Sequence, residues 1–331
     1  MRQRDFLASC LGAWFFLGRS AAAQPTRARL GWLSGGVGVR VRVNDMAESL
    51  IETLKRNLSD LGWRTGDTLD VDERQAGGDA SLLPHLSTEI VAQRPKVIAC
   101  TGGTEAKALQ SATREIPIVF LQVAVDPVAV GLVESISRPG GNVTGIMQAP
   151  QLLSSKRLSI VTELLGRPPR RLAYIVNPGN VNGARLWIDA AEAANNIGAE
   201  IDRVDVNTPL AVAGVFAGLK DRDAIIVQYD FLLVSLRNEI ADLAARQRLP
   251  VMYENQAHVL VGGLASYGAD LRENYRQGAL YIDRILRGAH PRDLPVVQGN
   301  RLELVLNVTT ANTLGLTIPP TLLARADEVI E

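Results

Sequence analysis

Residues that could hold a small ligand follow several short apolar runs of this sequence. The segment 101–104, TGGT, comes directly after the apolar run 97–100 and before a helical pattern. Glycine lets the backbone approach a ligand closely, and the free amides at a helix N-terminus favour a carboxylate or a phosphate. The same four residues could instead form a tight turn in which Thr104 caps the helix. The segment therefore indicates an anion contact, with a capped turn as the alternative.

Two aspartates occupy comparable positions. Asp126 and Asp230 each lie just past an apolar run. A carboxylate at such a position could form a charge-assisted hydrogen bond with a ligand amine, or it could cap the helix that follows. Because Tyr229 and Phe231 flank Asp230, we expect Asp230 to be the better ligand contact of the two.

Two tyrosines and a glutamate end later apolar runs. Tyr253 and Tyr267 could form aromatic walls with a polar tip, or they could be ordinary strand residues. Glu254 follows Tyr253 at a strand end, where burial of its charge would require a partner. All three are therefore candidate ligand contacts.

The motifs of common α/β enzymes do not occur in the sequence. The segment 35–38, GGVG, is not followed by the last glycine of a GxGxxG dinucleotide fingerprint. The sequence also has no GxxxxGK[ST] phosphate loop and no GxSxG elbow. His85, His258 and His290 lie far apart, so they form neither a catalytic set with serine and aspartate nor a metal site of familiar spacing. We expect a protein that is not an enzyme and that holds no metal or cofactor.

Composition excludes several other classes of protein. The chain has 331 residues, of which 47% are apolar and 21% are charged, so it is globular and long enough for two domains. Its 35 basic residues balance its 35 acidic residues. No net charge therefore favours nucleic acid or an acidic membrane surface, and we expect no nucleic-acid partner.

The segment 1–23 has the pattern of a secretory signal peptide. Arg2 and Arg4 precede an apolar run over 6–18, and an Ala-x-Ala cleavage site ends at Ala23. The run is shorter than the roughly 20 apolar residues that span a bilayer. An uncleaved anchor or a buried first helix is the alternative. We expect export, with cleavage near Ala23.

Apolar periodicity predicts strands that alternate with helices along the remaining chain. Strands are expected at 29–33, 69–74, 97–100, 117–121, 171–176, 200–206, 224–228, 250–253, 263–267, 294–297 and 302–306. Helices are expected at 46–61, 82–93, 105–112, 154–165, 183–197, 210–219, 232–248 and 271–287. This alternation predicts an α/β fold with parallel sheets and right-handed crossovers, in which ligands lie beyond the carboxyl ends of the strands.

The stretch 125–145 separates two halves that repeat this pattern. It contains an apolar segment and the turn PGGN at 139–142. The turn cannot continue a helix, because proline lacks a backbone donor and glycine is unfavourable in a helix interior. We therefore expect the chain to cross between two lobes in this stretch.

Five segments, in this order, are similar to those of a known family. They are LSGG at 33–36, DP at 126–127 with GLV at 131–133, PGGNVTG at 139–145, GGLASYGADL at 262–271 and LLARADEVIE at 322–331. The chain resembles the ABC-transporter substrate-binding family that includes the periplasmic tryptophan-binding type. The resemblance implies a type I periplasmic binding fold, with two Rossmann-like doubly wound lobes joined by three crossover strands. Lobe 1 would hold residues 28–146 plus 267–291, and lobe 2 residues 147–266 plus 292–331.

The resemblance also implies that hinge closure holds a small ligand between the lobes. With the candidates above, the expected ligand-binding residues are Ser34, Gly35, Gly36, Thr101, Gly102, Gly103, Thr104, Asp126, Asn177, Tyr229, Asp230, Tyr253, Glu254 and Tyr267. The expected ligand is an amino acid or an aromatic acid. We expect a periplasmic monomer that serves an ABC permease in the inner membrane. A ligand-sensing module for a membrane receptor is the alternative, and an α/β enzyme is a weaker one.

Overall fold

The two sheets of this protein are built around short strands that are buried along their whole length. In the computed structural model, β5 (Val97–Cys100) and β10 (Ala224–Val227) are buried at every position, as expected for inner strands covered by helices on both faces. The structure describes residues 27–36, 40–43, 46–123, 126–148, 153–180, 182–299 and 301–331. The predicted signal peptide, residues 1–23, lies outside the described residues.

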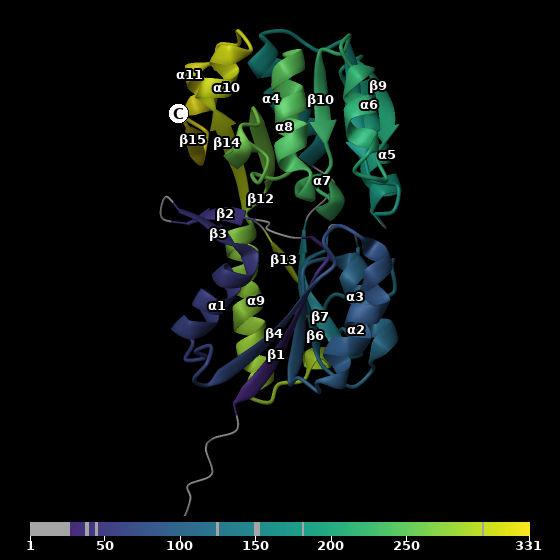
Figure 1. The fold of residues 1–331 in the computed structure, drawn as a ribbon, viewed down its shortest axis with the longest axis vertical. Helices are drawn as coiled ribbons and strands as arrows, with labels where there is room; N and C mark the ends of the chain where they lie inside the picture. Colours follow the sequence, from purple (N-terminus) through teal and green to yellow (C-terminus); the bar gives the residue numbers. More distant parts are fainter. Residues whose placement is uncertain are drawn as a thin grey trace, which may run out of the picture.

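The first lobe, at the bottom of Figure 1, contains a six-stranded parallel sheet in the order β13-β7-β6-β5-β1-β4. Besides β5, its strands are β1 (Ala28–Ser34), β4 (Leu69–Gln75), β6 (Ile118–Val123), β7 (Val143–Gln148) and β13 (Val297–Gly299). Its helices are α1 (Leu50–Asp60), α2 (Leu83–Ala92), α3 (Gly103–Ala112) and α9 (Leu271–Leu286). Leu30 and Trp32 pack in one buried cluster with α1 and α9, whereas Leu33 packs with α2 and α3 on the opposite face.

The second lobe contains a seven-stranded sheet in the order β15-β14-β12-β11-β10-β8-β9 (Figure 1). Besides β10, its strands are β8 (Arg171–Val176), β9 (Glu200–Asp205), β11 (Val251–Tyr253), β12 (Ala265–Ala269), β14 (Leu302–Asn307) and β15 (Glu328–Ile330). β12 and β14 run antiparallel, and the other paired strands are parallel.

Helices cover both faces of this second sheet. Residues of α4 (Leu153–Leu165) and α5 (Gly183–Asn196) form one buried cluster with the sheet, and residues of α6 (Ala211–Ala217) and α8 (Arg237–Gln247) form another. The remaining helical segments are α7 (Phe231–Ser235), α10 (Val308–Thr313), α11 (Pro320–Leu323) and the short turns η1 (Ala80–Leu82), η2 (Val259–Val261) and η3 (Pro291–Asp293). No helix in the described part of the chain is long and apolar enough to cross a membrane.

The chain passes between the two sheets three times: from β7 to α4, from β12 to α9, and from β13 to β14. The predicted fold class, two doubly wound α/β lobes joined by three crossings, is confirmed. The strands differ from the predicted lobe bounds in two places. β13 pairs with β7 in the first lobe, although residues 292–331 were expected in the second. β12 lies in the second sheet along its whole length, although a boundary was expected at residue 267.

The stretch expected to cross between the lobes stays within the first lobe. Its described residues 126–145 connect β6 to β7, and these two strands pair with each other. Strand β7 was not expected, because the glycine at its centre interrupts the apolar pattern. Gly145 has a φ of +152°, and a Cβ there would lie 2.0 Å from the carbonyl oxygen of Phe120. Glycine is therefore required for the close approach of these two strands.

Two predicted helices differ from the observed ones. The helix expected from residue 46 begins at Leu50, because β3 (Met46–Ser49) pairs with β2 (Arg40–Val43) and Ser49 accepts a capping hydrogen bond from the Glu52 amide. The long helix expected at 232–248 is two helices, α7 and α8, which meet at Leu236.

Candidate ligand-binding site

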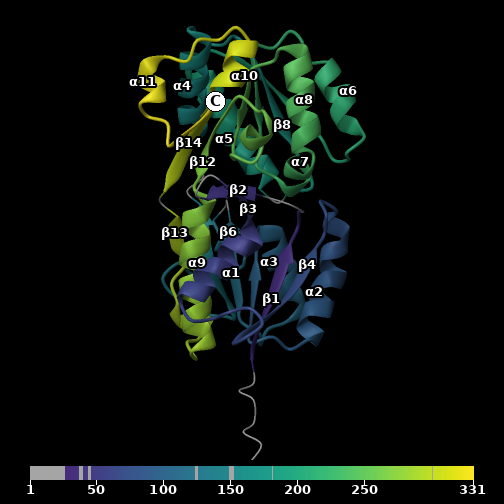
Figure 2. The ribbon, with the colours of Figure 1, turned by 60° about the vertical axis from the view of Figure 1, so that its left-hand side comes forward.

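Loops from the carboxyl ends of both sheets meet between the lobes. A small cavity of about 30 Å³ lies where they meet. Its lining comes from the loops after β1, β4 and β5 in the first lobe and from those after β8 and β10 in the second. The lining residues are Gly35, Gly78, Ala80, Leu83, Thr104, Glu105, Asn177, Gly179, Asn180, Asp230, Phe231 and Leu232. Figures 1 and 2 show α7 at the base of the second lobe, facing the first.

Glu105 organises the first-lobe side of this cavity. It lies in the first turn of α3 and is fully buried. Its Oε1 accepts hydrogen bonds from the Gly35 amide (2.8 Å) and the Thr101 hydroxyl (2.6 Å). Its Oε2 has no partner among the described residues. Burial raises the pKa of Glu105, and the charge of Asp230 raises it further, while the hydrogen bonds from Thr101 and Gly35 oppose the rise.

Asp230 organises the second-lobe side. It is the N-cap of α7, and its Oδ1 accepts from the Leu232 amide (2.8 Å). The same oxygen accepts from Asn177 Nδ2 (2.9 Å), and Oδ2 accepts from Asn180 Nδ2 (2.8 Å). Asp230 is 6% exposed, so these contacts compensate the burial of its charge. Asp230 thus caps a helix and also fixes two asparagines beside the cavity.

Phe231 reaches across from the second lobe to the glycine turns of the first. A Cβ at Gly35 would lie 2.9 Å from its ring, one at Gly36 would lie 3.0 Å away, and one at Gly102 would lie 3.4 Å away. The ring therefore occupies space that only glycines leave open. Among the other predicted residues, Ser34 donates a hydrogen bond to the Gly36 carbonyl (2.9 Å), Gly103 begins α3 and Thr104 lines the cavity.

A hydrogen bond also joins the lobes beside Phe231. Gln122 Nε2, at the end of β6, donates a hydrogen bond to the Tyr229 hydroxyl (2.6 Å). Burial raises the pKa of Tyr229 and keeps this hydroxyl neutral. The rings of Tyr229 and Phe231 pack edge to face with centroids 5.9 Å apart. Tyr229 therefore supports the position of Phe231.

Glu254 has the partner that its burial requires, and that partner is not in the cavity lining. Its Oε1 accepts from Arg157 Nη1 (2.7 Å) and from the Tyr174 hydroxyl (3.1 Å), and its Oε2 accepts from the Tyr229 amide (3.0 Å). Arg157 and Glu254 are both nearly inaccessible to solvent. Glu254 therefore holds the Tyr229 loop in place, since both of its carboxylate oxygens already have partners within the protein.

Three further predicted residues lie away from the described cavity lining. Tyr253 is fully buried within the second lobe and stacks on His258, with centroids 4.5 Å apart. Tyr267 packs against the cluster that contains α10 and α11, and its carbonyl accepts from Arg157 Nε (2.8 Å). Asp126 is exposed, and its Oδ1 accepts from the Val128 amide (2.9 Å). The two tyrosines are strand residues, which is the alternative left open by the sequence, whereas Asp126 holds a turn and caps no helix, because no helix of the described chain follows it before β7.

Glu105 and Phe231 were missed as members of the site. An acidic residue in the first turn of a helix is usually an exposed residue that favours the helix dipole, so Glu105 gave no signal of its own. The one available signal was its spacing: Thr101 precedes it by four residues at the end of a buried strand.

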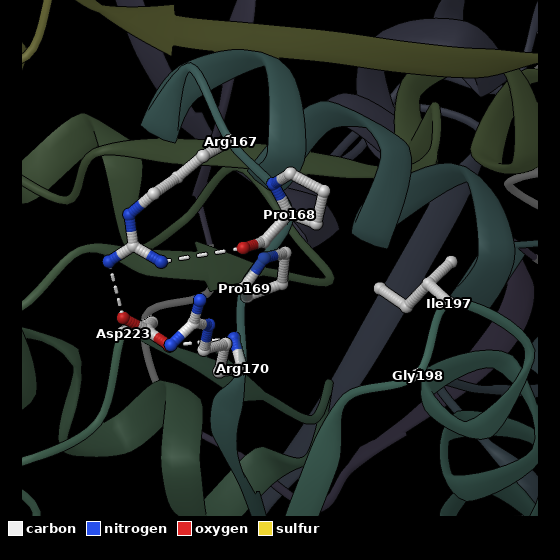
Figure 3. A pocket seen from close by; sticks show the side chains of 7 residues that line it. All are labelled: Arg167, Pro168, Pro169, Arg170, Ile197, Gly198 and Asp223. Atoms are coloured by element: carbon white, nitrogen blue, oxygen red, sulfur yellow. Dashed lines mark hydrogen bonds and ion pairs between the residues drawn. The ribbon is translucent and has the colours of Figure 1, made fainter.

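A second cavity, of about 590 Å³, lies at the opposite end of the second lobe (Figure 3). It is lined by Arg167, Pro168, Pro169, Arg170, Ile197, Gly198 and Asp223. Figure 3 shows Arg167 turned toward Asp223, which also accepts hydrogen bonds from the amides of Arg170 and Arg171. These contacts lower the pKa of Asp223 to about 2. The cavity borders the amino ends of β8 and β10, whereas ligands of such sheets bind at the carboxyl ends.

Comparison with known proteins gives several similar proteins. The chain is 28% identical over 262 residues to the tyrosine-binding protein of Clostridioides difficile (strain R20291), covering 78% of this chain and 74% of that protein. A conserved domain protein from Vibrio cholerae O1 biovar El Tor is 26% identical, with a TM-score of 0.81 over 91% of this chain and 99% of its own. A domain from Streptococcus pneumonia in complex with L-Trp is 24% identical, with a TM-score of 0.82 over 92% of this chain and 100% of its own.

The sequence profile of one family accounts for nearly the whole chain. The family is named ABC transporter substrate binding protein, and its profile matches residues 36–330 of this chain. The family that the five short segments indicated is thereby confirmed. This chain belongs to the ABC transporter substrate binding protein family.

Proposed function

We propose that this protein captures an amino acid or a related small solute between its lobes and presents it to an ABC permease in the inner membrane. The observation that carries the proposal is the meeting of Glu105 and Asp230 at one cavity, because they come from different lobes. A ligand that contacts both would favour the closed arrangement of the lobes. One relative is a tyrosine-binding protein and another was solved in complex with L-Trp, which supports capture rather than catalysis.

Capture requires the lobes to separate. The cavity of about 30 Å³ holds roughly one water molecule, far less than an amino acid. The hydrogen bond between Gln122 and Tyr229 and the contact of Phe231 with the glycine turns join the lobes in this arrangement. For a solute to reach Glu105, these contacts must open and then form again around it.

Members of this family are typically exported, and the N-terminal pattern supports the same fate for this chain. We propose a periplasmic protein that begins close to Gln24 after removal of residues 1–23. Edman sequencing of the protein recovered from a periplasmic fraction tests this. A chain recovered with its original N-terminus would contradict cleavage.

Titration calorimetry of the mature protein tests the function. The probes are L-tyrosine, L-tryptophan, L-phenylalanine and benzoate, and mass spectrometry of solute released on denaturation shows whether the cleft was already occupied. We expect heat and a rise in melting temperature with at least one amino acid, because a ligand that binds only the folded state stabilises it. The proposed solute class would be wrong if no probe gave heat or a thermal shift and no solute were released.

A further inference from the structure

One oxygen of a fully buried carboxyl group has no partner in this protein. Glu105 Oε2 lies in the cavity lining without a hydrogen bond from any described residue, whereas Oε1 accepts two. A buried acceptor without a donor is costly, so such a group in a folded protein calls for an explanation. A ligand donor would supply the missing contact.

The charges around this oxygen favour a cationic donor. Among the described residues, the cavity lining contains two carboxyl groups, Glu105 and Asp230, and no lysine, arginine or histidine. Both oxygens of Asp230 accept hydrogen bonds from neighbouring groups, so Asp230 contributes negative charge and leaves the open position to Glu105. A cation would relieve the repulsion between two acidic groups that face each other across the lobes.

Glu105 Oε2 and the ring of Phe231 lie close to the same glycine, Gly102. A Cβ at Gly102 would lie 3.1 Å from Glu105 Oε2 and 3.4 Å from the ring of Phe231, so the oxygen and the ring border the same point. An ammonium group that reached Oε2 would form a charge-assisted hydrogen bond with it and would lie near the ring of Phe231, which also attracts cations.

We propose that Glu105 receives the protonated amino group of the ligand, so that the cleft selects amine-bearing solutes over carboxylic acids that lack an amine. This inference rests on the proposed function, that is, on solute capture in this cleft. A protonated Glu105 would instead donate to a ligand acceptor and would not distinguish the two classes of solute.

Matched pairs of probes test the inference on the mature protein. L-tyrosine, L-tryptophan and L-phenylalanine are each titrated beside the deaminated analogue that keeps the side chain and the carboxylate: hydroxyphenylpropanoate, indolepropanoate and phenylpropanoate. We expect the amine-bearing member of a pair to bind about tenfold or more tightly than its analogue, because a charge-assisted hydrogen bond is lost with the amine.

Glu105→Gln identifies the group responsible. Glutamine keeps an acceptor for the Gly35 amide and Thr101 but removes the charge, so affinity for the amino acid should fall by about tenfold while that for the analogue stays the same. Glu115→Gln, an exposed glutamate of the same lobe, is the matched control and should bind as wild type. Glu105→Asp keeps the charge and should retain the preference for the amine, and thermal unfolding verifies that each variant folds.

The outcomes separate the two proposals. Equal binding of both members of a pair, or an unchanged preference in Glu105→Gln, would overturn the role of Glu105 and leave solute capture intact. The absence of binding to every probe would overturn both.

Discussion

Two buried glutamates of this protein are stabilised in different ways. Glu254 is surrounded by donors, including the guanidinium of Arg157, whereas Glu105 has one oxygen without a partner. The first arrangement is structural, because both carboxylate oxygens already accept hydrogen bonds from the protein. The second leaves a position open at the meeting of the lobes. The hydrogen bonds that each carboxylate accepts thus distinguish a structural glutamate, Glu254, from a candidate ligand contact, Glu105.

We expect Arg157→Met to destabilise the protein by about 3–5 kcal/mol, because it leaves the charge of Glu254 buried without its ion partner. Chemical denaturation at neutral pH measures the change. Arg167→Met is the matched control: Arg167 pairs with Asp223 but is exposed, so its loss should cost about 1 kcal/mol or less. The double variant Arg157→Met with Glu254→Gln should recover most of the loss. Equal costs for the two single variants would contradict the structural role of the buried pair.

At the scale of elements, the order of strands and helices could be predicted because apolar periodicity reflects burial within each lobe. Strand β7 and the break between α7 and α8 could not be predicted, since each depends on a local exception: the close approach of two strands at Gly145 and the interruption of the helix at Leu236. The loops that line the candidate site were predictable as strand ends. The closeness of Glu105 and Phe231 could not be predicted, because it depends on how the two lobes meet. Residue spacing within a single element carries no information about that contact.

The glycine turn after β1 is expected to control how closely the lobes approach. In Gly35→Ala, the new Cβ would lie 2.7 Å from Glu105 Oε1 and 2.9 Å from the Phe231 ring, so Phe231 must withdraw. We expect a larger radius of gyration in small-angle X-ray scattering and weaker solute binding, with little loss of stability within each lobe. Gly141→Ala, where a Cβ meets no atom within 4 Å, is the control. Scattering curves identical to wild type would show that this contact does not hold the lobes together.

At the scale of the whole molecule, buried charges gather where the chain crosses between the lobes. Asp270 lies between β12 and α9, and Glu303 lies at the start of β14, and both are about 2% exposed. Arg272 contacts both carboxylates, and Arg301 contacts Asp270. Two of the three crossings therefore share one network of charges, so its protonation state affects the connection between the lobes.

Glu303 should make the stability of this network depend on pH. Burial raises the pKa of Glu303 to about 8, and the charge of Asp270 adds to the rise, although Arg272 at 2.7 Å opposes it. The unfolded chain has an ordinary glutamate pKa of about 4.3. The folded state therefore holds the proton of Glu303 more tightly than the unfolded chain does. The stability contributed by protonated Glu303 is fully present below its pKa in the unfolded chain and is lost as pH rises through about 8.

Glu303→Gln cannot ionise, so its melting temperature relative to wild type should rise steadily between about pH 5 and about pH 8.5. The two proteins should be most alike at the acidic end, where Glu303 is protonated and glutamine resembles it in shape and hydrogen bonding to Gln256. Glu115→Gln, on an exposed residue, should show no such trend. Scanning calorimetry across this range measures the difference. A constant offset between Glu303→Gln and wild type would mean that Glu303 stays ionised at the crossing throughout, with Arg272 outweighing burial.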